Sequence, residues 1–188
     1  MSTFDRGFKT WAERTAISLR RELGLSPEAP LPHQKLSDYL EIKVITPNDI
    51  PGMTDELIRQ LLETDKAGWS GTSFTLSGKH TVIYNPSHSI GRQSSDISHE
   101  FSHIIIGHEP SKMILSADGE MVMRSHDQKQ EDEASWLGGC ILLPREALLH
   151  ISRTGQIETA CEKYSVSKEL LQYRLRATGV HYQIRRSH

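Results

Sequence analysis

Apolar residues recur at intervals of three and four along several separate stretches of this chain, a pattern that predicts a largely helical protein. The first such stretch covers residues 8–23 and is followed by Gly24, a residue type that commonly ends a helix. A second stretch begins after Thr54, whose hydroxyl can cap a helix. In that helix the pattern predicts four inward-facing side chains: Leu57, Ile58, Leu61 and Leu62.

Strand signals are fewer and occur in the first half of the chain. Residues 42–45, 69–76 and 80–85 have the composition of strands. Residues 77–79 supply turn chemistry between the last two stretches, which predicts a β-hairpin. We therefore expect an α+β fold in which a small antiparallel or mixed sheet accompanies the helices.

The second half of the chain combines an irregular stretch with another helix. Residues 109–128 show no clean period and contain a turn signal at 116–119, so they form either a simple connection or a loop that covers a site. Residues 130–143 open with acidic side chains and continue as an apolar run that must be buried. This predicts a core helix, and Pro144 then ends it or begins the next one.

The tail predicts a pair of short helices. Residues 156–164 have helical composition, a turn follows, and Ser167 can cap a second helix that runs to Gly179. The pair resembles a helix-turn-helix, and residues 151–188 carry seven Lys or Arg against three Glu. Such pairs are often packing units only, so DNA contact is compatible with the sequence and not favoured. We expect two units, residues 1–150 and residues 151–188, with the second packed on the first.

Composition limits the classes of function. The chain has 188 residues, 36% of them apolar, and a formal net charge of −2, so nothing draws it as a whole towards nucleic acid or an anionic membrane. Its apolar runs are too short to cross a bilayer, and its first residues lack a basic-then-apolar leader. Cys140 and Cys161 do not form a C-x-x-C pair. We therefore expect a protein of the reducing cytoplasm with no membrane partner.

One stretch carries the pattern of a metal site. His99, Glu100 and His103 form the motif H-E-x-x-H, which on a helix places two imidazoles one turn apart, where both can reach one zinc ion. Apolar residues at helical spacing around the motif supply a buried face, and Gly107 supplies a helix stop. The motif predicts a zinc-binding helix with Glu100 beside the metal as the general base.

A catalytic zinc commonly has three protein ligands and an open fourth position, so a third ligand must come from elsewhere in the chain. Glu133 is the predicted ligand, because a carboxylate at the start of an otherwise apolar helix is costly to bury unless it binds a cation. Glu131 and Asp132 are its rivals, since a helix dipole also favours acidic residues in the first turn. His108 lies one residue short of the spacing of a third histidine ligand, so we expect it near the site and off the metal.

These segments together resemble the ImmA/IrrE family of zinc metallopeptidases. Residues 99–103 are similar to the family pattern H-E-L-G-H, and residues 133–144 are similar to its pattern E-A-N-x-F-A-A-x-L-L-M-P in register. Asn85 and Arg92 also resemble family positions, and Ser135, which stands where Asn is usual, removes no ligand. The resemblance implies a zincin-like domain with a Zn²⁺ cofactor and four functional residues: the ligands His99, His103 and Glu133, and the general base Glu100.

The resemblance also implies a zinc-dependent endopeptidase that hydrolyses a specific bond in a partner protein, either a helix-turn-helix repressor or an antitoxin-like regulator. The predicted hairpin is the candidate edge on which such a peptide would add as an extra strand, and the sequence is equally compatible with an ordinary antiparallel pair that covers the core. One alternative is a DNA-binding regulatory module with a structural or vestigial zinc site. Another is a zinc hydrolase that acts on a substrate other than a peptide. Three residues are candidate donors to the oxyanion, and for each of them a structural role is the favoured alternative: His108, Tyr173 and Arg174.

Overall fold

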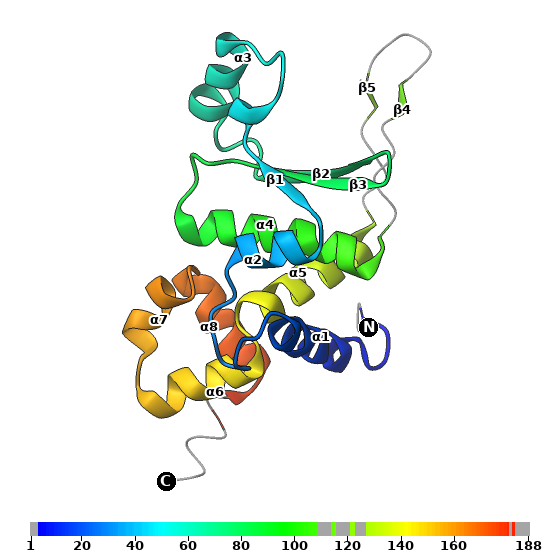
Figure 1. Ribbon diagram of the computed structural model, residues 1–188. Helices are drawn as coiled ribbons and strands as arrows, with labels where there is room; N and C mark the ends of the chain where they lie inside the picture. Colours follow the sequence, from blue (N-terminus) through cyan, green and yellow to red (C-terminus); the bar gives the residue numbers. More distant parts are fainter. Residues whose placement is uncertain (1–3, 109–113, 116–120, 123–126, 181, 183–188) are drawn as a thin grey trace.

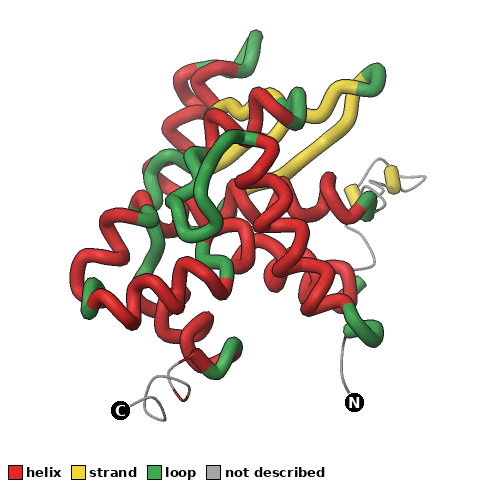
Figure 2. Tube along the Cα trace, turned by 60° about the horizontal axis from the view of Figure 1, so that its bottom comes forward, coloured by secondary structure: helices red, strands yellow, loops and turns green. Residues whose placement is uncertain are grey.

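The sheet, the helix Ile90–Ile106 and the helix Gln128–Leu142 lie in successive layers, and the other helices pack around them (Figure 1). The computed structural model describes residues 4–108, 114–115, 121–122, 127–180 and 182. The fold is of the mixed α+β type and mostly helical. Figure 2 shows from a second direction that the strands lie along one side and helices make up the rest. No helix in the described part of the chain is both long and apolar enough to cross a membrane.

The helices and strands have the following bounds. The α-helices are α1 (Phe8–Glu22), α2 (His33–Tyr39), α3 (Asp55–Arg59), α4 (Ile90–Ile106), α5 (Gln128–Leu142), α6 (Arg145–Thr154), α7 (Ile157–Lys163) and α8 (Lys168–Ala177). The strands are β1 (Lys43–Ile45), β2 (Gly71–Leu76), β3 (Lys79–Tyr84), β4 (Ile114–Leu115) and β5 (Met121–Val122). Two irregular helical turns, η1 (Pro47–Asp49) and η2 (Gln60–Thr64), flank α3.

The predicted hairpin is confirmed and forms part of a mixed three-stranded sheet. Its strand order is β1-β3-β2, with β1 parallel to β3 and β2 antiparallel to β3. Ser77 and Gly78 both have positive φ angles, of 51° and 77°, as the tight turn of a right-twisted hairpin requires. Among the described strands β2 therefore lies at one edge of the sheet.

The predicted helices are confirmed along most of the chain, and the caps explain where several of them begin. The Thr54 hydroxyl accepts a hydrogen bond from the amide of Leu57, and the Ser167 hydroxyl accepts one from the amide of Leu170. Pro144 separates two helices, because α5 ends at Leu142 and α6 begins directly after the proline. The turn signal at 116–119 lies outside the described residues.

The expected burial of the helix after Thr54 is wrong. None of the residues of α3 or η2 is buried, and Leu57 is 52% exposed. The α-helix is only five residues long and continues as a wider π-helical turn, so its apolar residues do not form one straight face. Figure 1 shows α3 standing on the side of the sheet that faces away from α4.

Two apolar clusters form the core. The larger one lies between α1, α4, α5 and the sheet and includes Phe101, Leu137 and Ile141. The second gathers side chains from the end of α5 and from α6, α7 and α8, including Leu148 and Leu171. Since α5 contributes to both clusters, it joins the two parts of the molecule, and the boundary near residue 150 stays a prediction.

Two fully buried arginines hold the carboxyl end of α5, where backbone carbonyls have no partner within the helix. Arg20 donates to the carbonyl of Ile141 at 2.8 Å, and burial lowers the pKa of its guanidinium to about 10, so it stays charged at neutral pH. Arg174 donates to the carbonyl of Leu143 at 3.0 Å and to the carboxylate of Glu13 at 2.6 Å. These charges tie α1 and α8 to the same helix end.

We predict that Glu13→Ala lowers the free energy of unfolding by about 3 kcal/mol, because it leaves the buried charge of Arg174 without its carboxylate. Urea denaturation followed by circular dichroism measures the change. The matched control is Glu22→Ala on the same helix, which removes an exposed contact with Arg21 and should leave stability close to that of the wild type. Equal losses in the two variants would contradict the assigned role of Glu13.

Candidate metal centre

Helix α4 presents two imidazoles to one point. His99 and His103 lie one turn apart, and their Nε2 atoms are 3.0 Å from each other. The apolar face of α4, which includes the fully buried Phe101, packs into the core and leaves these side chains on the adjoining face. Gly107 ends the helix in the left-handed conformation with a φ of 78°.

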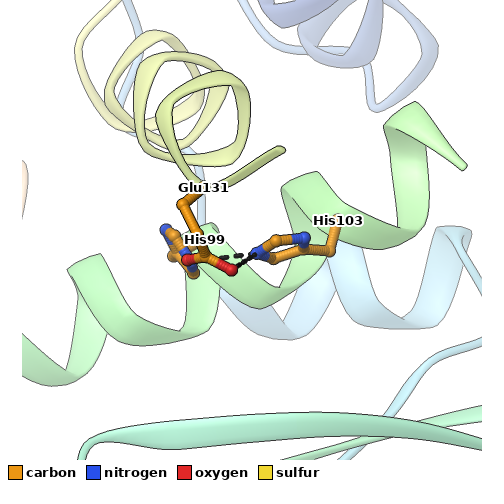
Figure 3. Close-up of side chains that lie close together, drawn as sticks. All are labelled: His99, His103 and Glu131. Carbon is orange, nitrogen blue, oxygen red and sulfur yellow. Dashed lines mark hydrogen bonds and ion pairs between the residues drawn. The ribbon is translucent and has the colours of Figure 1, made fainter. Parts of the chain in front are cut away.

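A carboxylate from the first turn of α5 completes the group. Glu131 places Oε2 at 3.1 Å from Nε2 of His99 and Oε1 at 3.6 Å from Nε2 of His103 (Figure 3). One ligand atom from each of the three side chains lies within 4.8 Å of the others. Two imidazole nitrogens and one carboxylate are a donor set typical of a catalytic zinc, so these residues fit the metal.

Glu133, the ligand that the sequence predicts, lies elsewhere. Its side chain is nearly buried, as expected, but Oε2 is 3.3 Å from Nε2 of His108 and Oε1 is 3.9 Å from Nζ of Lys129. Residues two apart on an α-helix point about 200° away from each other, so Glu131 and Glu133 cannot face the same point. The structure brings Glu131, and not Glu133, to the two histidines of α4. As a metal ligand Glu133 therefore remains a prediction.

Glu100 lies between α4 and the edge strand. The hydroxyl of Ser73 on β2 donates to its Oε2 at 2.5 Å. A Cβ at Gly71 would lie 3.6 Å from Cγ of Glu100, an ordinary van der Waals distance, so the start of β2 lies directly against this side chain. The carboxylate is thus held against β2, an edge strand among those described, and next in sequence to the candidate ligand His99.

The segment that leads into β2 is tied to the start of α4. Asn85 is fully buried and donates to the carbonyls of Lys66 and Trp69, at 2.9 and 3.2 Å. Arg92 donates to the hydroxyl of Ser70 at 2.8 Å. Asn85 and Arg92, which resemble family positions in the sequence, both fix the path of the chain just before the edge strand.

A cavity of about 410 Å³ adjoins His99. Its walls come from α4, α5 and α8 and include Ser95, His99, Ser135, Trp136 and Tyr173. Trp136 Nε1 is buried without a hydrogen-bond partner in the described structure. Sequence reasoning missed Trp136 as a neighbour of the site, although its place three residues after Glu133 put it in the same helical segment. Tyr173, a suggested oxyanion donor, lines this cavity and is 46% exposed.

The other two suggested oxyanion donors, Arg174 and His108, have hydrogen-bond partners within the protein. Arg174 is fully buried against Glu13 and the carbonyl of Leu143. His108 lies between His103 and Glu133. Its Nδ1 is 2.9 Å from Nδ1 of His103, and its Nε2 is 3.3 Å from Oε2 of Glu133. It is near the candidate ligands, as the sequence predicts, and it is not a member of the three-residue group.

Two histidines one helix turn apart, a carboxylate from α5 and an adjacent glutamate make up the candidate site. Residues 55–176 match the model of the Peptidase M78 family, described as the IrrE N-terminal-like domain, and the chain belongs to this family. The resemblance drawn from the sequence is thereby confirmed. No curated protein sequence matches the chain.

Solved structures also resemble this fold. A Mycobacterium tuberculosis transcriptional regulator superimposes with a TM-score of 0.51 over 92% of this chain, at 14% sequence identity. At that identity the likeness concerns the fold alone. The superposition covers 47% of the regulator, so this chain spans about half the length of that protein.

His33 on α2 forms a hydrogen bond with α4, the helix that carries the candidate ligands His99 and His103. His33 Nε2 lies 2.9 Å from the hydroxyl of Ser98, the residue before His99. Burial lowers the pKa of His33 to about 4, so the ring is neutral at physiological pH. In the unfolded chain His33 takes up a proton near pH 6.5, whereas in the native state it does so only near pH 4. The folded state therefore loses stability relative to the unfolded chain as the pH falls through this interval.

We predict that the free energy of unfolding of the metal-free wild type falls by up to about 3 kcal/mol between pH 7 and pH 4 because His33 is protonated more readily in the unfolded chain. His33→Gln keeps a donor for Ser98 and does not titrate, so its stability should decline less over the same interval. Urea titrations of both proteins at several pH values, with a chelator present, separate this effect from metal release. Identical pH slopes in the two proteins would contradict the prediction.

Proposed function

We propose that this protein is a zinc-dependent endopeptidase that hydrolyses a specific peptide bond in a partner protein. The observation that carries the proposal is the convergence of His99, His103 and Glu131 on one point, with Glu100 held beside them. A structural zinc site has a closed set of four protein ligands, whereas three ligands with an adjacent carboxylate are typical of a catalytic one. Membership of the Peptidase M78 family supports the same reading.

For the third ligand the geometry favours Glu131 over Glu133. The carboxylate of Glu131 contacts both histidines, while that of Glu133 is engaged by His108 and Lys129. Glu131 lies in the first turn of α5, where the positive end of the helix dipole stabilises a carboxylate whether or not a cation is bound.

Glu100 is the proposed general base. A zinc ion held by the three ligands would supply Lewis acidity, which lowers the pKa of a water molecule and polarises the scissile carbonyl. Glu100 takes a proton from the attacking water and delivers it to the amide nitrogen that leaves. The hydrogen bond from Ser73 fixes the orientation of the carboxylate, so little freedom is lost when a substrate binds.

The edge strand β2 offers a way to hold the substrate. Among the described strands it pairs only with β3, so its outer edge presents main-chain groups to an added strand. Ser73 on this strand contacts Glu100, which places the edge directly beside the proposed base. The cavity next to His99 is large enough for one side chain of such a peptide, and Trp136 offers an aromatic wall with a free N–H group.

The proposed substrate is a helix-turn-helix repressor or an antitoxin-like regulator. This part rests on the family resemblance, which implies such a partner, and not on the geometry of the site. The proposed zincin-like fold rests on the same resemblance, whereas the cytoplasm as the place of action rests on the two cysteines, which form no C-x-x-C pair.

DNA binding by the C-terminal helices is less well supported. A Cβ at Gly91 would lie 2.7 Å from the amide nitrogen of Ser167, so the turn before α8 packs against the start of α4. The amino-terminal end of a recognition helix must be free to enter the major groove. Arg174, one of the basic residues of this region, is fully buried.

We predict that Glu100→Gln abolishes cleavage and leaves zinc content and fold unchanged, because the base is lost while every ligand stays. The assay co-expresses the chain with candidate regulators encoded beside it and scores a cut by mass spectrometry. His103→Ala is the contrasting variant and should lose the metal. A Glu100→Gln protein that still cuts would refute the assigned role.

We also predict that Glu131→Gln weakens zinc binding by more than about 100-fold, beyond the cost of about 10–100-fold usual for residues that only support a ligand. Competition with a chromophoric chelator gives the dissociation constant. Asp132→Asn, a change of charge at the neighbouring position, is the control and should bind zinc nearly as the wild type does. A greater loss in Glu133→Gln than in Glu131→Gln would restore Glu133 as the ligand.

A further inference from the structure

The cavity beside the candidate ligand His99 is large enough to hold a ligand. Its volume of about 410 Å³ lies within the range of about 300–1,000 Å³ that is usual for binding pockets. Ser95 and His99, which are one turn apart on α4, both line it. The cavity therefore extends along the helix face that carries the candidate ligand, and a group that enters it lies next to the metal site.

The residues that line the cavity leave space in it and make much of its surface apolar. Four of them have no side chain or only a hydroxymethyl group, and these are Ser95, Ser135, Gly138 and Gly139. The larger apolar and aromatic side chains of the wall are those of Phe4, Trp136, Leu170 and Tyr173. A wall of this composition favours an apolar occupant, because burial removes apolar surface from water on both sides of the contact.

The ring of Trp136 is a rigid part of the wall. It is only 7% exposed, and it packs edge to face with the rings of Phe4 and Tyr173, at centroid distances of 5.4 and 6.4 Å. The guanidinium carbon of Arg174 lies 5.5 Å from the centroid of the same ring. A side chain that is already fixed loses little freedom when a ligand packs against it.

The charges around the cavity disfavour an ionic occupant. The ammonium group of Lys9 lies 4.1 Å from the centroid of the Trp136 ring, and Arg174 is close to the same ring, so a basic side chain would meet like charges. Asp132 also lines the cavity, so an acidic side chain would meet a like charge as well. A neutral, apolar side chain avoids both penalties.

Helix α8 forms one wall of the cavity. Leu170 and Tyr173 are one turn apart on this helix and both line the cavity, so they belong to the same helix face. A Cβ at Gly139 would lie 3.1 Å from Cδ of Arg174, whose guanidinium donates to the carbonyl of Leu143. The helix is thus packed tightly against α5, and the helix pair that resembles a helix-turn-helix contributes directly to the surroundings of the metal site.

We propose that this cavity is the specificity pocket of the peptidase and takes one large apolar side chain of the substrate, from a residue beside the scissile bond. Leu170 and Tyr173 are then specificity-determining residues, and α8 serves to recognise the substrate. The inference rests on the proposed function, and it holds whichever glutamate of α5 completes the metal site.

The test uses hydroxamates, which chelate zinc and hold an attached side chain beside the metal even when the natural substrate is unidentified. N-acetyl amino-acid hydroxamates place that side chain on one side of the chelating group, and 2-substituted succinyl hydroxamates place it on the other. Isothermal titration of the zinc-loaded, full-length chain compares methyl, benzyl and aminobutyl side chains in each series. In at least one series the benzyl compound should bind about 10–100-fold more tightly than the methyl compound, and the aminobutyl compound should gain much less.

Two variants connect this preference to the cavity. Ser95→Leu fills the space from α4 and should abolish the benzyl preference, while Tyr173→Ala opens the wall on α8 and should reduce it several-fold. Zinc affinity and binding of the methyl compound should stay unchanged in both. Gln172→Ala, a change at the exposed neighbouring position of α8, is the matched control and should keep the full preference. Tyr173 is 46% exposed, so its replacement carries the test if Ser95→Leu does not fold.

The outcomes separate the pocket from the metal site on which it depends. Wild-type protein that binds neither zinc nor the methyl compounds would overturn the metal site and the pocket together. Normal binding of zinc and the methyl compounds, with no gain from benzyl in either series, would overturn the pocket alone. A greater gain from aminobutyl than from benzyl, or an unchanged benzyl preference in both variants, would also overturn it.

Discussion

The close approach of α5 to α4 is the constraint on which the centre depends. At Gly138 the two backbones come so near that a Cβ would lie 3.2 Å from the backbone atoms of Ser98 and His99. Even the Cβ of an alanine would require the neighbouring backbone to move by a few tenths of an ångström, and packed cores do not absorb such a change without strain. At this separation the first turn of α5 lies over the histidines of α4, so Glu131 reaches both of them.

The rest of the fold keeps α5 at that separation. Arg20 and Arg174 donate hydrogen bonds to buried carbonyls at its carboxyl end, and each also contacts another helix or loop. The side chains of α5 enter both apolar clusters, so a movement of this helix would disturb the two parts of the core together. Buried charges of this kind add little net stability, but they penalise every arrangement in which their partners are lost. A helix that is fixed at its far end and along its length holds a carboxylate at its near end in a defined place.

How much of this the sequence predicts depends on how local each feature is. The helix with His99 and His103, its stop at Gly107 and the hairpin follow from periodicity and turn chemistry, which act within a few residues. The choice between Glu131 and Glu133 does not, because it depends on the rotation of α5 about its own axis, which distant contacts decide. The prediction that Glu133 is nearly buried is correct, but burial alone cannot tell a metal from His108 and Lys129 as the compensating partner. The exposure of Leu57 escaped prediction for a similar reason, since a regular apolar pattern does not show whether another element lies opposite it.

The two glutamates near the start of α5 face different partners. Glu131 lies in the first turn, where the helix dipole stabilises negative charge, and Glu133 lies in the next turn and points in another direction. One direction leads to the Nε2 atoms of the histidine pair, and the other leads to His108 and from there to the Nδ1 atom of His103. His103 is therefore approached by carboxylates on both sides of its ring, directly on one side and through a second imidazole on the other. Because both carboxylates belong to one rigid helix, the distance between α4 and α5 controls the contacts of His103 at both nitrogens at once.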